Sequence, residues 1–183
     1  MEVEETVRTL RVVRRFRTDP LAEKDVTAIL RAAHRTGSSK NKQRWAFIVV
    51  RDRERLAQLA EVGAFAGHLA GAAAAIALVT PDPAAAGSPY SVMWDLGRAA
   101  QNMILLAWER GIGSAPATVY EQELCRRLLG YPADHHCEYI LSLGYPADPA
   151  DLTRPLKPGG RRPLGEMVHQ ETWGMAGGPD SAG

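Results

Sequence analysis

The stretch from residue 92 to residue 111, VMWDLGRAAQNMILLAWERG, carries the strongest helical pattern in the chain. Its apolar residues recur three and four positions apart, the spacing that places them on one face of an α-helix. Gly111 comes after the last of them, and glycine accepts the backbone conformation that ends many helices. We therefore predict one long helix at the buried centre of the domain. Its apolar positions are Val92, Met93, Leu96, Ala99, Ala100, Met103, Ile104 and Ala107.

Short apolar runs before and after this helix predict the strands of a sheet. Residues 45–50, WAFIVV, are continuous and rich in residues that favour strands, as expected for a strand covered on both faces. Residues 74–80 and 138–144 predict two more strands. Helical spacing elsewhere predicts helices from residue 3 through Val13 toward Asp19-Pro20, from 26 to a cap at Gly37, from 56 to 60, from 64 to 72 and from 121 to 129.

The remaining segments are predicted to be loops. Residues 81–89 contain three prolines and form a loop near the substrate opening, so Tyr90 and Trp94 beside it are candidates to shape a substrate pocket. Residues 146–163 resemble an extended arm, and 164–173 add a strand or a short helix.

Length and composition indicate one globular domain over residues 1–173, followed by a disordered tail at 174–183. The net charge of +1 gives no general attraction to nucleic acid or to an anionic membrane.

Cys125 and Cys137 form no disulfide framework and are expected to be free thiols. No apolar run has membrane length, so we expect a cytoplasmic protein without a membrane partner. The histidines have no zinc-site spacing, and no metal is predicted.

Five short motifs occur in a fixed order over nearly the whole chain. Each motif alone is weak, but the ordered set with its spacings resembles the nitroreductase family. The resemblance implies an α+β fold with helices flanking a central mixed β-sheet, an intertwined homodimer, and two FMN molecules at the subunit interface. The motifs are Arg11-Val12-Val13-Arg14-Arg15-Phe16, Ser38-x-x-Asn41-x-Gln43-x-Trp45, Asp95-Leu96-Gly97-x-Ala99-x-Gln101-Asn102, Gly111-Ile112-Gly113-Ser114 and Arg161-Arg162-Pro163-Leu164.

Arginines from both ends of the chain are candidates to hold this cofactor. The FMN phosphate is a dianion, and guanidinium groups bind it through planar, charge-assisted hydrogen bonds. The resemblance places Arg11 by the phosphate and the ribityl chain, with Arg161, or Arg162 if the register shifts by one, closing from the C-terminal arm. It places Arg14 near the pyrimidine edge, where a positive charge stabilises the reduced ring. Taken alone, an arginine run at a helix end is more often a solvated surface.

The resemblance assigns two other segments to the flavin. Ser38, Ser39 and Asn41 would contact the FMN of the other subunit, with Gln43 also near it. Gly113 and Ser114 would direct backbone N–H groups toward flavin N5. No side chain is assigned a catalytic role.

The chain departs from the family pattern at two positions. Arg44 stands where the family has proline, and Val12 stands where serine is common, so Val13 and neighbouring backbone groups must compensate.

The function implied by the resemblance is an FMN-dependent oxidoreductase. It would use NAD(P)H to reduce a small electron-poor substrate, such as a nitroaromatic compound, a quinone or an activated alkene, by ping-pong hydride transfer through N5. Oxidative and dehalogenating relatives leave the direction of electron flow open. The alternatives are a non-catalytic protein that binds flavin or deazaflavin, and a nucleic-acid or protein adaptor, which the near-zero net charge disfavours.

Overall fold

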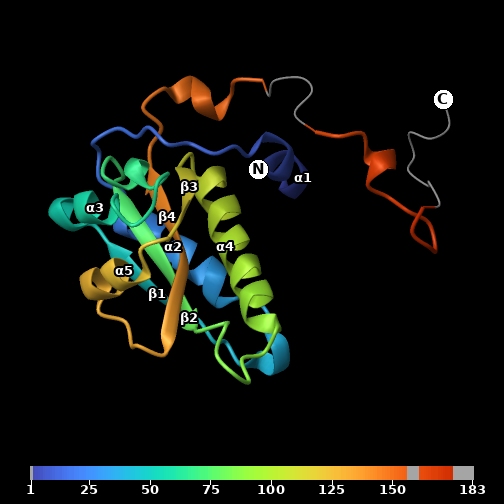
Figure 1. Cartoon of the computed structure of the whole chain (residues 1–183). Coiled ribbons are helices and arrows are strands. Elements are labelled where there is room, and N and C mark those ends of the chain that lie inside the picture. Colours follow the sequence, from blue (N-terminus) through green and yellow to red (C-terminus); the bar gives the residue numbers. More distant parts are fainter. Residues whose placement is uncertain (1, 156–160, 175–183) are drawn as a thin grey trace.

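The structure is a computed structural model that describes residues 2–155 and 161–174. A four-stranded sheet lies at its centre, with helices on both faces of the sheet (Figure 1). The predicted α+β fold class is confirmed. The elements are α1 (Val3–Thr9), α2 (Glu23–His34), β1 (Ala46–Val50), α3 (Arg53–Leu59), β2 (Ala74–Pro81), α4 (Ser91–Glu109), β3 (Gly113–Thr118), α5 (Gln122–Leu129) and β4 (His135–Gly144), with 3-10 turns at Ser39–Asn41, Gly67–Leu69, Pro149–Leu152 and Leu164–Glu166.

The strands follow the order β1-β2-β4-β3, and each neighbouring pair is antiparallel. Among the described residues, the parallel pairing expected of a mixed sheet is limited to one isolated bridge between Val12 and Ser114. Strand β2 is the buried centre of the sheet. Side chains alternate along it, so Ile76 and Leu78 pack on one face while Ala77 and Val79 pack on the other.

The helices form a layer on each face of this sheet. Helices α2 and α4 cover one face, where Ile29 and Met103 are fully buried against the strands. Helices α3 and α5 cover the other face, which includes the two cysteines; both are buried free thiols, as predicted. Across residues 2–155 and 161–174, the structure contains no helix long and apolar enough to cross a membrane.

Helix α4 confirms the long helix predicted from residues 92–111, and Gly111 follows it with a left-handed φ of 72°. Its burial is one-sided, however. Leu96 and Met103 are buried against the sheet, whereas Trp94 on another face is 69% exposed. The prediction of a helix at the buried centre therefore holds for only one face of α4 in the single chain.

The N-terminal helix is shorter than its apolar spacing predicts. Helix α1 ends at Thr9, and Leu10 already has an extended conformation with φ −52° and ψ 133°. The following residues pair with the sheet, because the Val13 N–H donates to the Ser114 carbonyl at 2.9 Å and the Arg17 N–H donates to the Tyr145 carbonyl at 2.9 Å. Pairing with the sheet, together with the strand preference of valine, overrides the helical spacing here.

Other boundaries also differ from the predictions. Helix α2 ends at His34, three residues before the predicted cap at Gly37, whose φ is not positive. The predicted helix over 64–72 is only the short turn Gly67–Leu69: glycines weaken helix propensity here, and in this segment only Ala66, Leu69 and Ala72 are buried. In residues 164–173 the structure forms a short 3-10 turn. Residues 156–160 of the predicted arm and 175–183 of the predicted tail lie outside the described residues.

Two strands differ from their predictions. Strand β1 is an edge strand and is mostly half-buried, so it is not covered on both faces within one chain. Strand β3 was not predicted at all, since Gly113 and Ser114 read as a loop and Pro116 argues against a strand. Proline is tolerated in β3 because this strand also lies at an edge of the sheet, where a backbone N–H has no neighbour to bind.

Candidate functional site

The predicted arginine motif lies on the outer edge of β3 and on the extension of β4. Its backbone is fixed at both ends: the Val13 N–H donates to the Ser114 carbonyl, and the Ala147 N–H donates to the Arg15 carbonyl, each at 2.9 Å. The structure thus joins the predicted Val12, Val13 and Ser114 in one local unit. Arg11 and Arg14 are carried on this same fixed segment.

Two glycines allow this close approach. Gly113 of β3 and Gly144 of β4 are partners in the register of the sheet. A Cβ atom on Gly113 would lie 2.6 Å from the Val13 Cβ, and one on Gly144 would lie 2.8 Å from the Phe16 Cγ. The paired glycines therefore leave a hollow that Val13 and Phe16 fill. In this structure the role of Gly113 is to admit Val13.

Arg11 has unused hydrogen-bonding capacity. One terminal nitrogen donates to the Arg154 carbonyl, while its Nε is buried and has no partner. The nearby carboxylates are engaged by another arginine, because Arg154 forms ion pairs with Asp148 at 2.6 Å and with Asp151 at 3.3 Å. No described carboxylate therefore forms an ion pair with Arg11.

Arg14 is the second available cation. Its side chain is exposed and forms no ion pair with any residue that the structure describes. The positive charge of Arg14 contributes to a lowered pKa of His68. Sequence patterns do not indicate His68 as a site residue, because it lies in a stretch of mostly small residues.

The imidazole of His68 is held under the edge of the sheet. Its Nδ1 lies 2.8 Å from the Ser142 hydroxyl, which in turn donates to the Ala115 carbonyl at 3.2 Å. Which of the two groups donates in the His68–Ser142 contact depends on the tautomer of the ring. The ring Nε2 is buried without a partner. Burial first, and then the positive charge of Arg14, lower the pKa of His68, which favours the neutral ring.

The predicted loop Ser38–Gln43 is ordered by its own side chains. The Ser38 hydroxyl accepts from the Gln43 N–H at 2.9 Å, and the Gln43 side-chain amide donates to Asn41 Oδ1 at 3.1 Å. Ser39 and Asn41 are exposed. The loop is anchored from below by Asp95, whose Oδ2 accepts from the Ser39 N–H at 2.9 Å. Sequence reasoning assigned Asp95 no specific role, so this contact was missed.

One chain does not bring this loop and the arginine segment together. The loop is bound to the first half of α4, at Asp95, whereas Ser114 follows the other end of the helix. A helix rises about 1.5 Å per residue, so residues 95 and 109 are separated by roughly 20 Å along α4. Within one protomer the predicted flavin contacts therefore fall into two groups at opposite ends of α4.

Four other predicted residues have no contact that assigns them to a site. Arg161 and Arg162 are exposed and form no ion pair with a described residue. Tyr90 is fully exposed and Trp94 is 69% exposed, so neither is enclosed in a pocket by this chain. Among residues 2–155 and 161–174, no cluster of three His, Cys, Asp or Glu side chains is suited to hold a metal ion.

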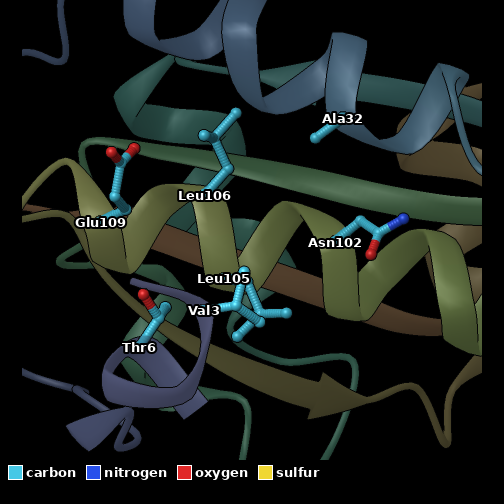
Figure 2. Close-up of a pocket in the computed structure, with 7 residues that line it drawn as sticks. All are labelled: Val3, Thr6, Ala32, Asn102, Leu105, Leu106 and Glu109. Atoms are coloured by element: carbon cyan, nitrogen blue, oxygen red, sulfur yellow. The ribbon is translucent and has the colours of Figure 1, made fainter. Parts of the chain in front are cut away.

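Two apolar grooves follow α4 on either side. Figure 2 shows the first, of about 310 Å³, where Val3 of α1 faces Leu105 of α4. The second, of about 350 Å³, lies between α4 and strands β2, β3 and β4, and includes Gly97, Pro116 and Leu141. Neither groove is lined by Arg11 or Arg14. The remaining lining residues of the first groove are Thr6, Ala32, Asn102, Leu106 and Glu109.

Comparison with known proteins gives a consistent result. The model of the nitroreductase family matches residues 7–66 and 63–145. A protein of Archaeoglobus fulgidus named as a candidate NADH dehydrogenase/NAD(P)H nitroreductase is 37% identical over 171 residues, covering 90% of this chain and 95% of that protein.

Solved structures agree with this match. A candidate NADH dehydrogenase/NAD(P)H nitroreductase from Parabacteroides distasonis superimposes with a TM-score of 0.80 at 24% identity, covering 93% of this chain and 98% of the other. An FMN-dependent nitroreductase from Clostridium difficile gives a TM-score of 0.69 at 26% identity, covering 78% and 87%.

Proposed function

Because the chain belongs to the nitroreductase family, we propose that it is an FMN-dependent oxidoreductase that uses NAD(P)H to reduce small electron-poor organic compounds. The observation that carries this proposal is the pair of arginines on the β3 edge. Neither arginine forms an ion pair with a described carboxylate, and the Arg14 side chain is exposed. A doubly charged phosphate would supply acceptors for the Arg11 guanidinium, and the negative charge of the reduced ring would lie beside Arg14.

The donor set of this chain fits FMN in three respects. Arg11 and Arg14 offer two charges on a segment whose backbone is already fixed. The pKa of His68 is lowered, first by burial and then by the charge of Arg14, so the neutral ring adds no competing positive charge. The exposed side chains of Ser39 and Asn41 both donate and accept hydrogen bonds, as the mixed edge of an isoalloxazine ring requires.

In this proposal the protein binds and orients, and the cofactor supplies the redox chemistry. Arg11 and the Ser38–Gln43 loop would hold FMN, which would supply hydride chemistry at N5 for a ping-pong reaction between NAD(P)H and a nitroaromatic, quinone or activated alkene. The protein contributes Arg11, which holds the phosphate, and Arg14, which places a positive charge beside the ring. That charge stabilises the reduced form and raises the reduction potential.

We further propose that the enzyme is a homodimer with FMN at its interface. The separation of the loop from the arginine segment supports this, because each flavin would then take one group of contacts from each protomer. The exposed Trp94 and the two apolar grooves beside α4 give the second copy an apolar surface to cover. Substituting Trp94 by glutamate should shift sedimentation toward the monomer and weaken flavin binding, whereas a monomeric wild type would contradict the proposal.

The phosphate contact is tested by comparing FMN with riboflavin, which lacks the phosphate. Arg11→Gln should weaken FMN binding about tenfold or more, as expected for a lost charged hydrogen bond, and leave riboflavin binding nearly unchanged. Arg15→Gln is the matched control, because Arg15 is exposed on the same segment and loses the same charge. An equal loss in both variants would contradict the assignment of Arg11, and failure of the wild type to bind FMN would overturn the proposed function.

The rate of NADH or NADPH oxidation distinguishes an enzyme from a protein that only carries flavin. The loaded protein should oxidise NADH or NADPH faster than an equal concentration of free FMN, and a nitroaromatic or quinone should increase the rate. A carrier would give no rate above free FMN. The cytoplasmic location stays a prediction.

A further inference from the structure

The Ser38–Gln43 loop has a backbone that its own residue types disfavour. Lys40, Asn41 and Gln43 have φ values of 50°, 52° and 48°. Residues other than glycine rarely adopt this left-handed region, and such a conformation persists only where the surrounding structure holds it. Three such residues within four positions require restraint; the loop's own side chains supply part of it, and the rest comes from outside the loop.

Helix α4 provides that restraint through a row of three polar side chains, here called the α4 clamp: Asp95, Arg98 and Asn102. Asp95 Oδ2 accepts from the Ser39 N–H at 2.9 Å. The other two bind just before the loop: Arg98 Nη1 donates to the Gly37 carbonyl at 3.1 Å, and Asn102 Nδ2 donates to the Thr36 hydroxyl at 2.7 Å. Positions 95, 98 and 102 lie on one face of a helix, so the clamp acts as a unit.

Asp95 is the member of the clamp that binds the loop itself. Its side chain is only 8% exposed, and it forms no ion pair with a described residue. A buried carboxylate without a cation is costly unless it accepts strong hydrogen bonds, and the Ser39 N–H is the donor that this structure provides. This bond joins an exposed loop residue to a buried carboxylate, so it ties the loop backbone to α4.

We infer that Asp95 is a positioning residue that holds the loop in its left-handed form before cofactor binding, so that Ser39 and Asn41 already face the flavin held by the partner protomer. The inference rests on the proposed function for the identity of the ligand. The order of the loop, in contrast, is a property of the flavin-free protein and does not depend on which ligand binds. With the loop ordered in advance, binding does not have to restrict it, and affinity rises by the cost avoided.

The first readout is amide hydrogen exchange of the loop in the flavin-free protein. Asp95→Ala should accelerate exchange of the Ser39 amide and its neighbours, while exchange in β2 stays slow. Asp95→Asn keeps an acceptor oxygen and nearly the same volume, so it should give an intermediate rate and also remain folded if the alanine variant does not. Unchanged loop exchange in both variants would overturn the inference, whatever the cofactor proves to be.

The second readout is the affinity for flavin. Asp95→Ala should weaken FMN and riboflavin binding alike, by about tenfold, because the loop is assigned to the ring and not to the phosphate. This pattern differs from that of Arg11→Gln, which should affect FMN alone. Equal affinity in wild type and Asp95→Ala would also overturn the inference. If the wild type binds neither flavin, the proposed function fails, while the exchange experiment still tests the clamp.

Asp52→Ala is the matched control. The Asp52 carboxylate also accepts a backbone N–H, that of Arg55 at 2.8 Å, but it does so at the start of α3, which packs on the opposite face of the sheet. This variant loses the same kind of bond and should change neither loop exchange nor flavin affinity. A change in loop exchange as large as that of Asp95→Ala would show a general effect of stability and would overturn the specific role of Asp95.

Discussion

Gly113→Ala tests whether the close contact with the arginine segment sets the geometry of the site. The backbone φ at Gly113 is not left-handed, so alanine is compatible with the strand. The added Cβ, however, would lie 2.6 Å from the Val13 Cβ and 2.9 Å from each of the Val13 Cγ atoms. Carbon atoms pack at about 3.5–4.0 Å, so Val13 must move by roughly 1 Å.

The cost follows from what this movement disturbs. Overpacking of a buried site costs about 1–3 kcal/mol. Displacement of Val13 also strains its hydrogen bond to the Ser114 carbonyl, and the loss of such a bond adds about 0.5–1.5 kcal/mol. We therefore expect Gly113→Ala to lower the free energy of unfolding by about 2–4 kcal/mol, and to weaken FMN binding because Arg11 and Arg14 move with Val13.

Urea denaturation of the flavin-free protein measures the first effect, and a double-mutant cycle identifies its cause. Val13→Gly removes all three contacting atoms and lowers stability by itself because Val13 is buried, but in this background Gly113→Ala should cost much less than in the wild type. Val13→Ala keeps the Cβ that would lie 2.6 Å away, so in that background the cost of Gly113→Ala should fall by less. Gly71→Ala is the control, because a Cβ there meets nothing within 4 Å. A Gly113→Ala variant within about 0.5 kcal/mol of wild type would refute the reasoning.

Three smaller predictions follow from single contacts. The pKa of His68 is lowered from 6.5, so the unfolded chain binds more protons; the contribution of this residue is present above pH 6.5 and is lost as the pH falls toward the folded-state pKa. The stability difference between wild type and His68→Asn should therefore shrink from pH 8 to pH 5 in urea titrations, and a constant difference would contradict this. Asp52→Ala removes the cap of α3 and should lower the free energy of unfolding by about 1 kcal/mol in the same assay. Gly130→Ala places a side chain at φ 72° after α5 and should cost about 1 kcal/mol, whereas an unchanged denaturation midpoint would show that the α5 end relaxes freely.

Much of the fold is predictable from local sequence pattern. The spacing of Leu96 and Met103 identifies α4, and Gly130 marks the end of α5, because both signals arise within one helix. The strand at 74–80 is equally evident. Predictions fail where partners distant in sequence decide the structure. Val13 leaves the helical pattern to pair with Ser114, and β3 forms despite Pro116 because β4 binds it on one side.

The candidate site also contains residues that sequence motifs indicate and residues that they do not. Motif order indicates Arg11, Arg14 and the Ser38–Gln43 loop, and the structure fixes the backbone of the first segment on the β3 edge. Spacing alone does not identify His68 or the bond from Asp95 to Ser39, since each depends on a partner more than fifty residues away. The one available signal for the clamp is the helical spacing of Asp95 and Asn102.

Pro116 has a consequence for the solubility of the chain. Ser114 directs its carbonyl away from β4 toward Val13, so Pro116, two residues further along the strand, also faces outward. At that position proline offers no N–H, and the neighbouring outward position is already occupied by the arginine segment. A foreign strand therefore cannot dock along β3, and this side of the sheet is protected against edge-to-edge aggregation. Among the described residues of the folded chain, β1 is the edge strand that remains open to sheet extension.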